Sequence, residues 1–182
     1  MSTRIVPTTR DSAPAATRPL LDQMQATIGM IPKLYATMGH SPGSLQSYLA
    51  WDTAVARSSL SRREIELLNL HVSELNGCAY CVSAHHFVAG KSGLDDATIA
   101  SARAGKGANA REDALLALAR RVVRTGGQGA GSDLVRAREA GVSDAEIIDT
   151  LAIIALKTFS NSLALVARTE IDFPRPPYPP AE

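Results

Sequence analysis

Apolar residues recur along most of the chain at the three- and four-residue spacing of amphipathic α-helices. No stretch shows the alternation of apolar and polar residues that is typical of a half-buried strand. The clearest helix is predicted between about residues 61 and 75, where apolar side chains leave almost no polar face: Leu67, Leu68, Leu70, Val72 and Leu75. We therefore predict an all-α fold, a multi-helix bundle in which this helix is buried.

Start and stop signals delimit the predicted helices. Ser61 followed by Glu64, and Ser143 followed by Glu146, have the spacing of a capping box, in which the two side chains satisfy each other's backbone N–H groups. Asn76-Gly77 should end the first of these helices, because both residues tolerate a left-handed cap. The remaining helices are predicted at about 18–28, 31–38, 44–58, 78–90, 95–105, 112–125 and 133–140, and the last helix at 143–168.

The chain divides into three parts by composition. Residues 1–17 are rich in Ser, Thr, Pro and Ala and are expected to form a flexible N-terminal arm, and residues 18–172 the helical domain. Residues 173–182 are expected to form a proline-rich extended tail. A chain of 182 residues suits one such domain with a sizeable core.

Charge and hydropathy narrow the class of protein. The formal net charge is +1, so the chain lacks the basic excess that nucleic-acid binding requires. The longest apolar run, 151–156, is cut off by Lys157, well short of the roughly 18 residues that span a membrane. The N-terminus shows no apolar core of a secretory signal, so we expect a cytoplasmic protein without membrane or nucleic-acid partners.

Candidate chemistry is concentrated in one stretch, residues 74–86, which holds both cysteines and two of the four histidines. On a helix, Cys78, Cys81 and His85 share one face. Cys78 and Cys81 are close enough to form a disulfide, and His85 lies one turn from Cys81, where an imidazole can take a thiol proton. In the reducing cytoplasm such a pair is more often catalytic or metal-binding than a structural disulfide.

These segments together resemble the alkylhydroperoxidase D-like, or carboxymuconolactone decarboxylase, family, and in particular its peroxidase-related branch. The resemblance is carried by 31–35 (Ile-Pro-Lys-Leu-Tyr), by 60–64 (Leu-Ser-Arg-Arg-Glu) and, most specifically, by 75–85 with its Asn-Gly-Cys-x-Tyr-Cys-x-x-x-His core. The short 93–95 segment and the late helix with Asn161 also fit. The family implies an all-helical domain that assembles into dimers, trimers or hexamers, and thiol-dependent reduction of organic or hydrogen peroxide.

By this resemblance, Cys81 attacks the peroxide, Cys78 resolves the product as a disulfide, and His85 relays a proton. The acidic member of the relay falls on Glu66. An external dithiol would then reduce the disulfide, and no cofactor or metal is needed in that cycle. Tyr80 stands where the best-studied peroxidase type has a histidine.

Physical arguments leave two choices open at this stage. The helix dipole would lower the pKa of Cys78 most, whereas the nearby His85 favours Cys81, and we side with Cys81 because a directed hydrogen bond is the more local effect. Glu66 reaches His85 only if the chain reverses at Asn76-Gly77 into an antiparallel hairpin. Glu74 is the alternative acid if the helix continues.

Three other functions compete with the peroxidase. A zinc site could use Cys78, Cys81 and His85 with His86 or His71, although three of these ligands lie on one helix. The dithiol could instead serve redox sensing or disulfide exchange without turning over a peroxide. A lactone decarboxylase is the third alternative, but that chemistry does not need a thiol pair. The partners expected for the first function are a peroxide, a dithiol reductant and further copies of the chain.

Overall fold

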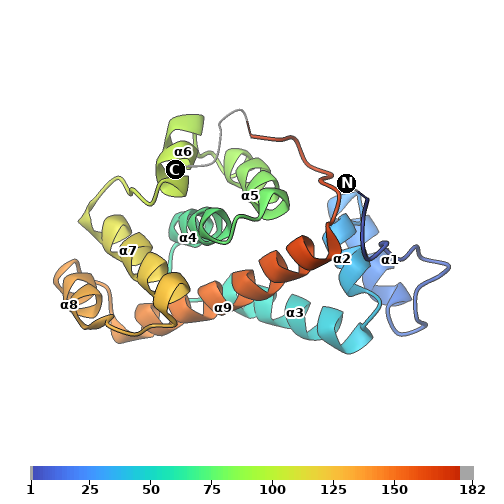
Figure 1. Ribbon diagram of the computed structural model, residues 1–182, viewed down its shortest axis with the longest axis horizontal. Helices are drawn as coiled ribbons and strands as arrows, with labels where there is room; N and C mark the ends of the chain where they lie inside the picture. Colours follow the sequence, from blue (N-terminus) through green and yellow to red (C-terminus); the bar gives the residue numbers. More distant parts are fainter. Residues whose placement is uncertain (1, 177–182) are drawn as a thin grey trace.

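The protein is described by a computed structural model covering residues 2–176, and over that range it is helical, with no strand (Figure 1). This confirms the predicted all-α class; residues 177–182 of the predicted tail lie outside the described residues. The nine helices of the described range are α1 (Arg18–Ile28), α2 (Lys33–Met38), α3 (Pro42–Val55), α4 (Arg62–Leu75), α5 (Ala79–Lys91), α6 (Asp96–Arg103), α7 (Ala110–Thr125), α8 (Gly131–Glu139) and α9 (Asp144–Ala167).

Helix α4 lies at the centre of the bundle. It packs against α5, α6, α7 and α9, and Figure 1 shows α5 and α6 on one side of it and the long α9 on the other. Its apolar side chains Leu68, Leu70 and Val72 are fully buried, as predicted. The helix also buries polar groups, among them Glu66 and His71, so burial extends well beyond its apolar residues.

Both predicted capping boxes are present and are joined by one arginine. The Ser61 hydroxyl accepts a hydrogen bond from the Glu64 N–H, and the Glu64 carboxylate accepts one from the Ser61 N–H at 2.8 Å; Ser143 and Glu146 repeat the arrangement on α9. Arg111 of α7 donates to both cap carboxylates, at 2.7 Å to Glu64. The local signals that begin α4 and α9 thus also fix where the two helices start relative to α7.

Glycines in the left-handed conformation follow several of the helices. Gly29 and Gly126 end α1 and α7 in the left-handed conformation. At the predicted break after α4, Asn76 keeps a right-handed backbone and only Gly77 is left-handed, with φ of +66°. The chain reverses there, and α5 returns along α4.

The residues before α1 lie against the domain. The backbone N–H of Arg4 donates to the Ala167 carbonyl at 2.8 Å, and that of Thr8 to the Ala36 carbonyl at 3.2 Å. Ala13 and Thr17 are buried. The two ends of the helical domain are therefore tied together by the segment that precedes it.

Helix α9 has 24 residues and, by length and composition alone, is the one described helix that could also cross a membrane, which the sequence analysis did not expect. Half of its most apolar stretch is buried inside the protein. It packs against α2, α3, α4, α5 and α7, and a core helix of a globular protein passes the same test of composition.

Candidate redox site

The α4–α5 hairpin brings together residues that are distant along the chain. Because α5 returns antiparallel to α4, the Nδ1 atom of His85 lies 3.2 Å from the Glu66 carboxylate. The Glu66 carboxylate also accepts a hydrogen bond of 3.4 Å from the Asn69 amide. The structure therefore pairs His85 with Glu66 rather than with Glu74, whose carboxylate instead accepts a hydrogen bond from Arg103 at 2.7 Å.

Cys78 and Cys81 form a buried pair of free thiols at the start of α5. Cys78 is the residue that caps the helix, and its sulfur accepts the Cys81 backbone N–H at 3.3 Å. The two sulfurs lie 2.7 Å apart. Since the side chains already face each other, forming the disulfide requires little movement of the backbone.

The surroundings of the pair favour a negative charge on Cys78 over one on Cys81. Hydrogen bonds from the Cys81 thiol and from backbone N–H groups at the helix end lower the pKa of Cys78. The neighbouring Cys78 sulfur, together with burial, raises the pKa of Cys81 above its ordinary value. The first negative charge of the pair thus rests on Cys78. For the resting state, the prediction from the helix dipole, which favours Cys78, is therefore better than the prediction from the nearby His85, which favours Cys81.

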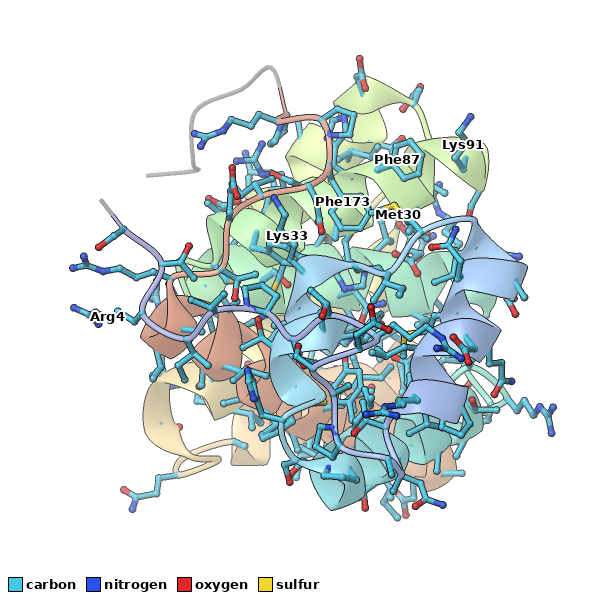
Figure 2. All side chains as sticks on the ribbon, turned by 90° about the vertical axis from the view of Figure 1, so that its right-hand side faces the viewer. Arg4, Met30, Lys33, Phe87, Lys91 and Phe173 are labelled. Atoms are coloured by element: carbon cyan, nitrogen blue, oxygen red, sulfur yellow. The ribbon has the colours of Figure 1, made fainter. Side chains whose placement is uncertain are left out.

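Each thiol lines a different cavity. The Cys81 cavity, of about 400 Å³, is mostly apolar, and it is lined among others by Met30, Tyr35, Tyr48, Phe87, Leu156 and Phe173. Figure 2 shows Met30, Phe87 and Phe173 gathered on one side of the molecule, where the C-terminal segment crosses α5. The Cys78 cavity, of about 350 Å³, is lined by Glu74, Arg103, Ile171 and Arg175 among others. Cys81 is therefore the thiol that an apolar ligand would meet.

One residue of the Cys81 cavity was missed by the sequence analysis. Lys157 of α9 is only 4% exposed, and its ammonium nitrogen lies 3.4 Å from the His85 Nε2 atom, 3.4 Å from the Tyr48 hydroxyl and 3.6 Å from the Asp52 carboxylate. Burial alone would lower the pKa of this ammonium, but Tyr48, Asp52 and Glu66 outweigh it and hold the pKa of Lys157 above its ordinary value. The signal in the sequence was a lone lysine directly after the apolar run 151–156 of α9.

The ligands considered for zinc do not come together. The His71 Nδ1 atom lies 3.2 Å from the Arg103 carbonyl oxygen, and His86 pairs with Asp96 at 3.5 Å. Within residues 2–176, no group of three His, Cys, Asp or Glu side chains is arranged to hold a metal ion. Tyr80 is buried; its hydroxyl accepts the Leu34 N–H at 3.3 Å, and its ring meets that of Phe173 edge-on.

Fold and site together define an all-helical protein whose buried Cys-x-x-Cys pair places Cys81 on an apolar cavity. Residues 42–125 match the model of the carboxymuconolactone decarboxylase family. A protein of unknown function from Agrobacterium tumefaciens, provisionally named as the antioxidant defence protein AhpD, shares 28% identity over 74% of this chain and 94% of its own, with a TM-score of 0.67. Comparison with curated proteins found no match.

Two further solved structures share the fold over nearly the whole chain. An uncharacterized peroxidase-related protein from Ralstonia eutropha JMP134, with an alkylhydroperoxidase AhpD core, is 22% identical over 93% of this chain and 92% of its own, with a TM-score of 0.83. The debrominase Bmp8 is 21% identical over 94% of both chains, with a TM-score of 0.79. Residues 42–125 thus match the carboxymuconolactone decarboxylase family, and the chain shares the fold of the AhpD-like structures.

Proposed function

We propose that the protein is a cytoplasmic, thiol-dependent peroxidase that reduces organic hydroperoxides and, less efficiently, hydrogen peroxide. The observation that carries this proposal is the position of Cys81, which lines an apolar cavity together with the Glu66–His85 pair and has Cys78 directly behind it. An apolar cavity favours a substrate with a hydrocarbon body, because burying that body drives binding. The peroxidase-related family members support the same reading.

The chemistry needs only the two thiols and a proton relay. The dithiol first gives one proton to the His85 relay, which leaves a thiolate on Cys78. The Cys81 sulfur then attacks the distal oxygen of the hydroperoxide as its proton passes to Cys78; the S–O bond forms, the O–O bond breaks, and the alkoxide leaves as the alcohol with the proton that the relay held. Cys78 then attacks the sulfenic acid on Cys81, which releases water and closes the disulfide. An external dithiol supplies the two electrons that restore both thiols.

His85 is held in one tautomer for this relay. Glu66 accepts the Nδ1–H of the imidazole, so the Nε2 atom is left as the base that faces the cavity. The carboxylate also stabilises the imidazolium once His85 has taken the first proton of the dithiol. This is the arrangement of a base and its orienting acid that activates nucleophiles in other enzymes.

The test is a stopped-flow titration of the reduced protein with cumene hydroperoxide and hydrogen peroxide, with Cys81→Ser and Cys78→Ser as matched variants. We expect Cys81→Ser to lose the reaction and Cys78→Ser to stop at a sulfenic acid that a dimedone probe traps. If the wild type reacts no faster than free cysteine, the protein is not a peroxidase. Disulfide exchange with a protein partner, without peroxide turnover, would then be the better function.

A second candidate rests on the aromatic side chains around Cys81, which include Tyr35, Tyr48 and Phe87. The debrominase of the same fold was captured with 2,3,4-tribromopyrrole. A dithiol can remove bromine reductively: one thiolate takes the halogen, the ring carbon takes a proton, and the second thiol displaces bromide as the disulfide forms. Release of bromide from tribromopyrrole by the wild type, lost in Cys81→Ser, would favour this reaction over peroxide reduction.

A further inference from the structure

A buried lysine needs an explanation, because transferring an ammonium group from water into a protein interior is costly unless it is paired. Lys157 is almost fully buried in the middle of α9. Its one carboxylate neighbour within 4 Å among the described residues is Asp52, at 3.6 Å, and the Asp52 side chain is 44% exposed. That pair alone offers α9 little stability, since an apolar residue in the same place would avoid the cost of burial.

The polar groups around Lys157 come from three different helices and all line the Cys81 cavity. Tyr48 and Asp52 lie on α3, Glu66 lies on α4, and His85 lies on α5. The Tyr48 hydroxyl and the His85 Nε2 atom are each 3.4 Å from the ammonium nitrogen. The lysine is therefore held in place on the cavity surface, beside the base of the proposed relay and on the same cavity as the Cys81 thiol.

We propose that Lys157 is a catalytic residue that receives the leaving oxygen of the peroxide. This inference rests on the proposed peroxidase function and adds a residue to it. As Cys81 attacks and the O–O bond breaks, negative charge develops on the oxygen attached to the organic group. A fixed cation in a mostly apolar cavity stabilises that charge strongly, and Lys157 then gives the alkoxide one proton to form the alcohol.

His85 takes up one proton of the dithiol and later returns it to Lys157. The dithiol loses its first proton to the His85 Nε2 atom, and the second passes from Cys81 to Cys78 during attack and leaves in water when the disulfide forms. After Lys157 has protonated the alkoxide, the imidazolium returns its proton to the lysine amine across the 3.4 Å contact. In this order of steps, His85 holds the proton and Lys157 donates it to the leaving oxygen.

The effect of removing Lys157 should depend on the leaving group of the oxidant. An alkyl hydroperoxide expels a strongly basic alkoxide, which needs the lysine, whereas an aromatic peracid expels a carboxylate, which does not. We expect Lys157→Met to slow the reaction of Cys81 with cumene hydroperoxide about 100- to 1000-fold, the usual effect of removing one such group. The same variant should react with perbenzoic acid within about fivefold of the wild type.

The experiment is single-turnover stopped flow on the full chain with both oxidants, with Lys91→Met as the matched control. Lys91 is an exposed lysine at the end of α5, and its removal should leave both rates unchanged. Thermal melting checks that Lys157→Met is folded, and Lys157→Gln replaces it if it is not. A wild type that reacts with neither oxidant faster than free cysteine overturns the proposed function itself.

Two results would overturn the role of Lys157 while leaving the peroxidase intact. If a folded Lys157→Met reacts with cumene hydroperoxide as fast as the wild type, the lysine takes no part. If both oxidants slow by the same factor, Lys157 acts on the thiol and not on the leaving oxygen. Only selective loss of the hydroperoxide reaction supports the inference.

Discussion

Acid should destabilise this protein through one histidine outside the redox site. His71 of α4 is 2% exposed, and its Nδ1 atom lies 3.2 Å from the Arg103 carbonyl oxygen, to which it donates as the neutral imidazole. Burial, assisted by the nearby cations Arg120 and Arg124, lowers the pKa of His71 from 6.5 to about 4. The imidazole is thus neutral in the folded protein at every pH at which the protein is expected to work.

The sign of the effect follows from which state binds the proton first. On acidification the unfolded chain takes up a proton near pH 6.5, whereas the folded protein does so only near pH 4. Stability is therefore full above about pH 6.5 and is lost as the pH falls towards 4. At about 1.4 kcal/mol per unit, His71 should lower the free energy of unfolding by about 2 kcal/mol between pH 7 and pH 5, and by about 3 kcal/mol at pH 4.

The assay is urea unfolding at pH 7 and pH 5 of the wild type, His71→Gln and the matched control His40→Gln. Glutamine does not titrate, and its amide can still donate to the Arg103 carbonyl. We expect the wild type and His40→Gln, whose histidine is exposed, to lose about 2 kcal/mol more than His71→Gln between the two pH values. Equal losses in all three proteins would show that the acid sensitivity lies in groups other than His71.

Three further predictions concern the fold. Gly105→Ala should lower the free energy of unfolding, measured in urea, by about 2–4 kcal/mol, because Gly105 has a left-handed φ of +75° and an added methyl group would overlap Arg120 and His71. A decrease of less than about 1 kcal/mol would contradict this. Ser61→Ala should lower the free energy of unfolding by about 1 kcal/mol through loss of the α4 cap, and an unchanged melting temperature would contradict that. We also propose that a second copy of the chain covers the outer face of α9, where Ile148 is 65% and Val166 60% exposed. Light scattering at micromolar concentration should then show an oligomer that Ile148→Lys weakens, and a monomeric wild type would refute the proposal.

The sequence predicted those features that depend on neighbouring residues. Ser61 and Ser143 form their capping boxes because each cap involves residues only three apart. Glu66 was expected from the family resemblance, and a reversal at Asn76-Gly77 made its pairing with His85 possible but left Glu74 open as the alternative. The helices themselves were predicted well. The observed start of α3, however, lies about two residues before the predicted one, because the cap residue Ser41 was overlooked.

The features that were missed depend on residues far apart in sequence. Lys157 contacts Tyr48 and His85 only because α9 packs against both α3 and α5, and no local pattern fixes those contacts. The separate cavities of the two thiols depend on the segment after α9, which contributes Phe173 to one cavity and Ile171 to the other. The sequence predicted an extended tail from residue 173 onward but gave no indication of where in the fold it would lie.

These distant contacts bear on what the Cys-x-x-Cys motif does in this chain. The geometry of the helix start places the resting negative charge of the pair on Cys78, yet the apolar cavity meets Cys81. In the proposed peroxidase, the Cys81 proton therefore passes to Cys78 during the attack, and the cation of Lys157 on the same cavity receives the charge of the leaving oxygen. By this argument, a related chain with the same motif but no positive charge at this point of α9 would be better suited to disulfide exchange through Cys78 than to reducing hydroperoxides.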